Sequence, residues 1–293
     1  MAGNLPQDLI VDILSRLPVK SLLKFRCVSK SWCVLITDPA FVKIHLNQSL
    51  ATNTNHTLIF RKDSACYSVD VDPDACEPPL NHPLKSLIFG PRAVLGSCNG
   101  LVCISNSLDD IYLWNPSTRS HLKLPFSPIE SSISYDSAYG FGYEPTSDDY
   151  KVVRAVDEFV IVYSLRTNSW RRIGKLPFSL FNNDWGGGVL VNSALHWVAK
   201  VRSIISFHLK DEEYREVPLP HFMDDDDFVD NKFLMKVGVL GGQLCLLCNY
   251  SNRVEIWVMK DYGMRDSWVK QFSNEKPSVD GLVILGIVLV SMA

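Results

Sequence analysis

A recurring aromatic position constrains the fold of most of this chain. From residue 58 onward, short runs rich in Val, Ile, Leu and aromatic residues alternate with clusters of Gly, Asn, Asp and Pro, a pattern typical of β-strands joined by turns. Five of these runs end in an aromatic residue, and successive ones lie 47, 49, 44 and 50 residues apart: Tyr67, Trp114, Tyr163, Phe207 and Trp257. The chain therefore carries a degenerate internal repeat of about 48 residues.

The length of the repeat predicts a β-propeller. A period near 48 exceeds that of ankyrin or leucine-rich repeats and fits one four-stranded blade of the kelch kind. A single blade cannot bury both faces, so blades stack radially and large aromatic side chains fill the space between them. Seven residues after three anchors come His121, Trp170 and Tyr214, and Trp268 follows Trp257 by eleven.

The N-terminal segment, residues 5–37, shows helical rather than strand periodicity. Pro6 suits a first helical turn, apolar residues follow at helical spacing, and Pro18 ends the helix. Residues 21–26 and 29–36 predict a second and a third helix, and Asp38-Pro39 predicts the cap of a fourth over about 39–48. Fewer than about 40 residues rarely bury enough surface to stand alone, so some apolar side chains await a partner.

Residues 4–45 resemble an F-box. The resemblance rests on Leu-Pro-x-Asp-Leu, Ile-Leu-x-Arg-Leu-Pro, Lys-Ser-Leu-Leu and Phe-Arg-Cys-Val-Ser-Lys-Ser-Trp, in this order. It implies docking onto the Skp-family adaptor of an SCF ubiquitin ligase and, through it, onto cullin and RING subunits. The resemblance implies that some of the matching positions contact the adaptor and the others form the core of the box. These positions are Leu5, Pro6, Leu9, Ile13, Leu14, Leu17, Pro18, Leu22, Leu23, Val28 and Trp32.

Charge argues against a nucleic-acid or membrane surface as partner. The first 45 residues hold six Lys and Arg against three Asp, which suits an acidic protein surface better than DNA. The whole chain has a net charge of −3 and a pI near 6.2. The start, Met1-Ala2-Gly3-Asn4, has no basic and apolar signal segment, so we expect the cytoplasm or the nucleus.

The repeat region supports a second resemblance, to the F-box-associated domain of plant F-box proteins. It covers about residues 95–270 and rests on motifs in a distinctive order: Gly96–Cys103, Leu113–Arg119, Gly140–Tyr143, Asp149–Val153, Val162–Ser164 and Leu195–Trp197. The family implies a kelch-like propeller that recruits substrates, in a group that includes pollen S-locus F-box proteins and defence regulators.

The sequence offers weak candidates for chemistry. Gly96-Ser-Cys-Asn-Gly100 matches the G-x-nucleophile-x-G elbow of some hydrolases, but a β-type run follows it where the elbow requires a helix. His196 in the Leu-His-Trp motif is interpreted as a packed side chain. Cys245 and Cys248 have zinc-like spacing, yet no second pair or nearby His completes a site. We therefore predict a non-catalytic protein with no metal and no cofactor.

Two segments are candidates for target binding. One is an acidic run that is either a solvated loop or a contact for a basic target: Asp224, Asp225, Asp226 and Asp227. The other is Trp185, flanked by Asn and Gly residues, which either recognises a target or packs between blades.

These observations predict an α+β multidomain chain: an F-box three-helix module over 1–48, a linker over 49–57 and an all-β kelch-like propeller over 58–293. Residues 282–290 predict the opening strand of a sixth blade that is not completed, so truncation, alternative splicing and a different closure stay open. The predicted function is target recognition for an SCF-type ligase. Two alternatives remain: a pollen S-locus-type protein that recognises basic secreted RNases, and a protein-binding propeller without ligase linkage.

Overall fold

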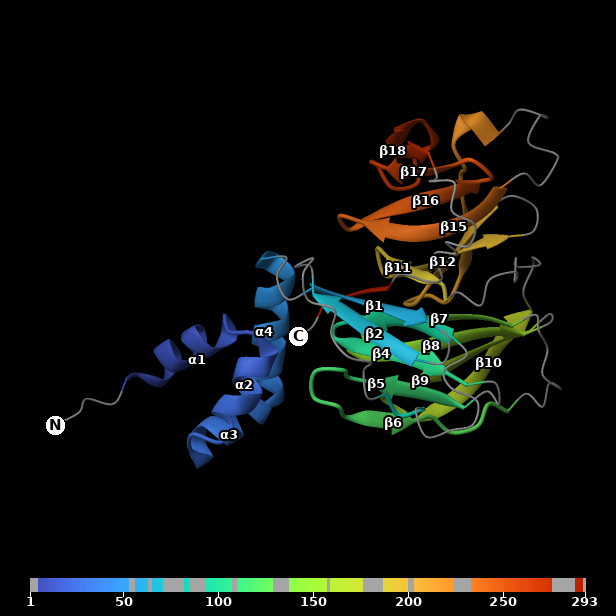
Figure 1. Cartoon of the computed structure of the whole chain (residues 1–293). Helices are drawn as coiled ribbons and strands as arrows, with labels where there is room; N and C mark the ends of the chain where they lie inside the picture. Colours follow the sequence, from blue (N-terminus) through green and yellow to red (C-terminus); the bar gives the residue numbers. More distant parts are fainter. Residues whose placement is uncertain are drawn as a thin grey trace.

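The structure, a computed structural model, places a helical module beside a set of antiparallel sheets (Figure 1). It describes residues 5–52, 56–62, 65–70, 82–84, 93–106, 110–128, 137–156, 159–175, 187–199, 203–223, 233–275 and 288–291. No helix in these ranges is long and apolar enough to cross a membrane.

The helical module, which we call the box, contains α1 Gln7–Ser15, α2 Val19–Phe25, α3 Lys30–Thr37 and α4 Pro39–Thr52. The predicted cap of the fourth helix is present, because the Asp38 carboxylate accepts from the Ala40 N–H at 2.7 Å. The Ser29 hydroxyl also caps α3 by accepting from the Trp32 N–H. The fourth helix continues to Thr52, four residues past the boundary predicted at 48. The box core is small and centres on buried side chains from all four helices: Leu14, Leu22, Ile36 and Phe41.

The described strands form five antiparallel sheets, the blades. Blade 1 has the order β19-β1-β2 and takes β19 Val288–Ser291, β1 His56–Lys62 and β2 Ala65–Asp70. Blades 2 and 3 contain β3 Ala93–Cys98, β4 Leu101–Ser105, β5 Ile111–Trp114, β6 His121–Lys123, β7 Ser137–Glu144, β8 Asp149–Val156, β9 Phe159–Ser164 and β10 Ser169–Lys175.

Blades 4 and 5 repeat the four-stranded meander. They contain β11 Val189–Val191, β12 Ala194–Ala199, β13 Ser203–His208, β14 Tyr214–Val217, β15 Phe233–Leu240, β16 Gln243–Tyr250, β17 Arg253–Met259 and β18 Trp268–Glu275. Two short 3-10 turns, η1 His221–Met223 and η3 Arg265–Ser267, follow β14 and precede β18. The first strands of neighbouring blades lie side by side, which gives the radial arrangement of a propeller.

In blades 2 to 5 the aromatic repeat corresponds to the hairpin of the third and fourth strands. All five anchors lie on the third strand of their sheet, and three of them pair directly with the residue seven positions later: Trp114 with His121, Tyr163 with Trp170, and Phe207 with Tyr214. In blade 5 the connection is longer and contains η3, so Trp268 pairs with Met259 rather than with the anchor.

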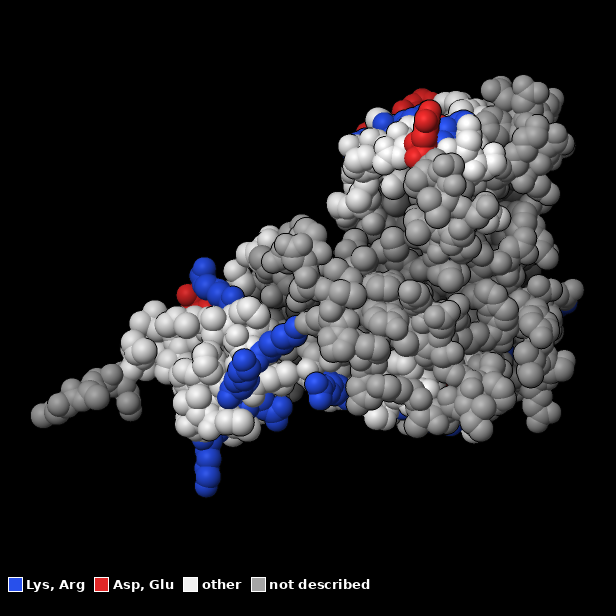
Figure 2. Space-filling view, viewed as in Figure 1, with Lys and Arg blue, Asp and Glu red and all other residues white. Residues whose placement is uncertain are grey.

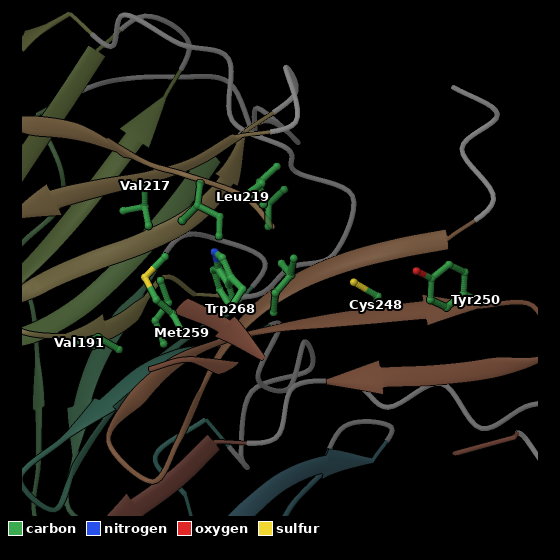
Figure 3. Close-up of a cluster of buried hydrophobic side chains, with 11 residues drawn as sticks. Val191, Val217, Leu219, Cys248, Tyr250, Met259 and Trp268 are labelled. Carbon is green, nitrogen blue, oxygen red and sulfur yellow. The ribbon is translucent and has the colours of Figure 1, made fainter. Parts of the chain in front are cut away.

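Buried side chains fill the space between blades, as the repeat predicts. Figure 3 shows the cluster formed mainly by blades 4 and 5, which includes Val191, Val217, Cys248, Met259 and Trp268. Two tryptophans on fourth strands also bond to the preceding blade. The Trp170 indole N–H donates to the Pro125 carbonyl at 2.8 Å, and that of Trp268 donates to the Pro218 carbonyl at 2.9 Å.

The C-terminal strand does not open a sixth blade, and that prediction is corrected. Val288–Ser291 pairs antiparallel with β1, in a register that joins His56 to Ser291 and Ile59 to Val288. The strand thereby satisfies the free edge of β1 and builds one sheet from the first and last described strands of the propeller. Residues 276–287, which hold the rest of the predicted run, lie outside the described residues.

Candidate protein-interaction site

Helix α1 exposes an apolar stripe on the surface of the box. Leu9 and Ile13 lie four residues apart on α1, so they lie on one side of the helix, and Leu5 lies two residues before the helix begins. Their side chains are 59%, 51% and 51% exposed. Val28, between α2 and α3, is 62% exposed. Aligned apolar side chains left in water at this density are typical of a surface that another protein covers.

Other residues of the predicted adaptor set hold the box together. Leu14 and Leu22 are buried at 1% and 4% exposure. Leu17 and Trp32 are partly buried and pack against this core, where the Trp32 ring meets Phe25 edge to face at 5.7 Å. Truncating these residues would damage the fold of the box rather than a contact surface.

The remaining members of the set are two prolines at helix ends and Leu23 within α2. Pro6 and Pro18 are exposed and occupy the N-cap positions of α1 and α2, where a missing N–H costs nothing. Leu23 is half-buried. The structure thus separates the positions that the sequence could only group.

Several exposed apolar side chains of the box were not predicted. Val34 on α3 is 70% exposed, and Val42, Ile44 and Leu50 on α4 are each nearly half exposed. The signal was available in α4, whose apolar residues do not follow one face. A helix with apolar residues all round predicts contacts on more than one side.

The surface of the box carries more basic than acidic side chains. Figure 2 shows Lys and Arg spread over the box, with few acidic side chains on this face. Asp12 is paired within α1, where Arg16 donates to its carboxylate at 2.8 Å. The box thus combines apolar and positive surface, which suits a partner that is apolar at its centre and acidic at its rim.

The candidate target-binding residues, Trp185 and Asp224 to Asp227, lie outside the described residues. In the sequence, Trp185 precedes β11 and the acidic run precedes β15. Their proposed roles in target binding therefore stay predictions.

The hydrolase elbow is a β-hairpin turn. Asn99 and Gly100 have φ angles of 51° and 77° and connect β3 to β4, which fits the type I′ turn favoured by Asn-Gly. Burial raises the pKa of Cys98 to about 12, against a weaker opposing bond from the backbone at Tyr143. A partly buried, protonated thiol followed by a strand lacks both features of an activated nucleophile.

His196 is a packed histidine. Its Nε2 lies 2.7 Å from the Tyr262 hydroxyl and its Nδ1 lies 3.3 Å from the Val189 carbonyl oxygen. Burial lowers its pKa to about 4, so the ring is neutral at pH 7. It joins blade 4 to the connection before β18.

The thiols of the two cysteines with zinc-like spacing lie on opposite faces of a strand, so they cannot bind one metal ion together. Cys245 and Cys248 lie three residues apart on β16, so their thiols point to opposite faces of the sheet. Burial raises the pKa of both thiols, to about 11 and about 12. Within the described ranges, no group of three or more His, Cys, Asp or Glu could hold a metal ion.

A small helical box with an apolar stripe, followed by a propeller of four-stranded sheets, defines a protein of the interaction class. Comparisons with known proteins specify the family. The F-box domain model matches residues 3–44, and the model of the F-box associated beta propeller domain matches residues 57–290. The chain belongs to the plant F-box proteins that carry an F-box-associated propeller, and its F-box domain implies binding of a Skp1-like adaptor.

Curated relatives match nearly the whole chain. F-box protein CPR1 of Arabidopsis thaliana is 40% identical and covers 94% of this chain and 74% of its own length. The F-box/kelch-repeat protein At3g23880 of the same plant is 32% identical, over 92% of this chain and 79% of its own. Among solved structures, the beta-propeller domain of Myceliophteria thermophila Cps50 (Swd1) covers 64% of this chain and 55% of its own at 11% identity, with a TM-score of 0.39, too low to carry an argument.

Proposed function

We propose that this protein is the substrate-recognition subunit of an SCF-type E3 ubiquitin ligase in the cytoplasm or the nucleus. The observation that supports this most strongly is the exposed stripe of Leu5, Leu9 and Ile13. The side chains that hold the box together, such as Leu14 and Leu22, point elsewhere and are buried, so the stripe is free to bind a Skp1-like adaptor. Cullin and RING subunits join through that adaptor.

The mechanism is an increase in effective concentration. The box binds the adaptor and the propeller binds a target protein, so lysines of the target stay near the ubiquitin thioester of an E2 enzyme. Other subunits perform the transfer. This chain contributes binding and geometry, and its function depends on both domains being present in one polypeptide.

The stripe can be tested in the full chain with Leu9→Glu combined with Ile13→Glu. The double variant should no longer co-purify with a Skp1-like adaptor, because binding would bury two unpaired carboxylates in an apolar contact, and this desolvation is costly. Val269→Glu is a matched control, since Val269 is 46% exposed on β18, far along the chain from the box. Unchanged adaptor binding by the double variant, with the control also unchanged, would reject the docking surface.

Two alternatives make different predictions for the same preparations. A propeller without ligase linkage would retain its targets and bring down neither adaptor nor cullin. An S-locus-type protein would bind basic secreted RNases through the acidic run, so changing Asp224 to Asp227 into Asn should weaken binding of a basic RNase in low salt. If neither salt nor the substitution changes RNase binding, the acidic run is a solvated loop that does not contact the RNase.

A further inference from the structure

An ion pair joins the box to the propeller at a single hairpin. Lys43 of α4 donates to Asp148 in the turn between β7 and β8, with 2.5 Å between Nζ and Oδ2. Both side chains are more than half exposed, at 60% and 55%. Among the described residues, no helix makes an extensive contact with a strand of the propeller. The ion pair is therefore part of a narrow contact between the two parts.

The α4 end of this contact is fixed within the box. Phe41 and His45 lie two residues to either side of Lys43 and are buried at 3% and 4% exposure. The His45 Nε2 lies 2.9 Å from the Leu17 carbonyl oxygen, which links α4 to the segment after α1. The backbone at Lys43 is therefore held by the core of the box, so the position of Lys43 follows the orientation of the whole box.

The hairpin end is equally well ordered. The buried Glu144 carboxylate accepts hydrogen bonds from the N–H groups of Thr146 and Ser147 at 2.8 and 2.7 Å, so the turn is closed from inside. Asp148 has a φ of 52°, and the Tyr143 hydroxyl donates to its Oδ1 at 2.7 Å. One carboxylate oxygen is held by the propeller, and the other faces Lys43.

We infer that Lys43 and Asp148 are positioning residues that fix the angle between the adaptor-binding box and the propeller. This inference rests on the proposed function for its purpose but not for its geometry. An exposed ion pair adds little to global stability. The box and the propeller are joined by one segment of chain, so a small free-energy difference is enough to favour one angle between them. In a ligase, that angle sets which target lysines reach the E2.

Small-angle X-ray scattering of the full chain tests the geometry without any partner. Lys43→Glu and Asp148→Asn should each broaden the distance distribution, with a roughly two- to fivefold loss of the joined arrangement, the range typical of exposed pairs. Asn tolerates the positive φ, so the second change removes charge and keeps the turn. Lys43→Arg should preserve the wild-type curve, and 0.5 M NaCl should make the wild type resemble Lys43→Glu.

The matched control is Asp211→Asn. Asp211 pairs with Arg215 at 2.7 Å and similar exposure, but both lie in blade 4. The control should scatter like the wild type. Combining Lys43→Gln with Asp148→Asn should add nothing to either single change, because both break one contact. Wild-type scattering by Lys43→Glu, or additive effects in the double variant, would overturn the inference.

A reconstituted ligase then tests the consequence. With adaptor, cullin, RING subunit and E2, ubiquitin transfer to the propeller's own lysines should shift to different sites in Lys43→Glu, as mapped by mass spectrometry, while adaptor affinity stays unchanged. A shift in sites at equal affinity supports positioning. Absence of adaptor binding by the wild type would refute the proposed function and leave the scattering result standing, whereas normal assembly with an unchanged site pattern would refute positioning.

Discussion

Gly187 and Gly174 differ in the space that a side chain would find. A Cβ on Gly187 would lie 1.6 Å from the carbonyl oxygen of Leu95, a backbone atom of β3 that cannot move alone, whereas a Cβ on Gly174 meets nothing within 4 Å. We expect Gly187→Ala to lower the free energy of unfolding by about 3 kcal/mol, as overpacking of a tight contact does. Gly174→Ala should change it by less than about 0.5 kcal/mol. Urea unfolding followed by tryptophan fluorescence measures both, and equal effects would contradict the close approach.

His196 should make stability depend on pH. Its pKa falls from 6.5 to about 4 on folding, because burial disfavours the charged ring. Below pH 6.5 the histidine is protonated in the unfolded chain but stays neutral in the folded chain. The free energy of unfolding is therefore highest above pH 6.5 and falls as the pH drops toward 4. Between pH 7.5 and 5.0 the wild type should lose about 2 kcal/mol more than His196→Gln.

The measurement is urea unfolding at the two pH values. Tyr262→Phe serves as the control, because it removes the 2.7 Å hydrogen bond and leaves the titrating ring in place. It should be less stable at both pH values and retain most of the pH dependence. A histidine variant as sensitive to acid as the wild type would assign the effect to other groups, among them His208, whose pKa burial also lowers.

At the scale of elements, the junctions between blades carry a repeated tryptophan hydrogen bond. Trp170→Phe and Trp268→Phe each remove one indole donor, to Pro125 and to Pro218, while keeping an aromatic ring. Each should cost about 1 kcal/mol, and the effects should add because the bonds lie at different junctions. Thermal unfolding of the single and double variants tests this. Phe126→Leu, at a side chain 77% exposed, should leave stability unchanged, and strongly non-additive losses would show that the junctions are coupled.

The sequence predicted the repeat and its blades, and the structure explains the seven-residue spacing within it by cross-strand pairing. Tyr163 and Trp170 are seven residues apart and lie directly opposite each other on β9 and β10, so their spacing reflects the short turn between these strands. It could not predict the bonds to Pro125 and Pro218, since nothing in local spacing indicates which carbonyl of the preceding blade lies within reach. It also missed that β19 pairs with β1, because pairing between chain ends leaves no periodic signal.

For the candidate site, helical periodicity identified which residues of the box are apolar but not which side each one faces. Leu9 and Leu14 share a helix and a residue type, and yet one is 51% exposed and the other 1%. The difference depends on where α4 packs, which is a tertiary contact. The same limit applies to Val34, whose 70% exposure follows from the packing of α3 and not from its neighbours in the sequence.

For the whole molecule, closure of blade 1 should decide whether the chain stays monomeric. Strand β19 covers one edge of β1, and Leu58 pairs with Leu289 at the centre of their ladder. A chain that ends after residue 287 would leave this edge unpaired beside apolar strands, a template for pairing with other chains. We expect it to aggregate in proportion to concentration, measured by light scattering, whereas a chain that ends after Ser291 keeps the strand and should behave like the full chain. If both shortened chains remain equally monomeric, the pairing of β19 with β1 does not protect the edge from pairing with other chains.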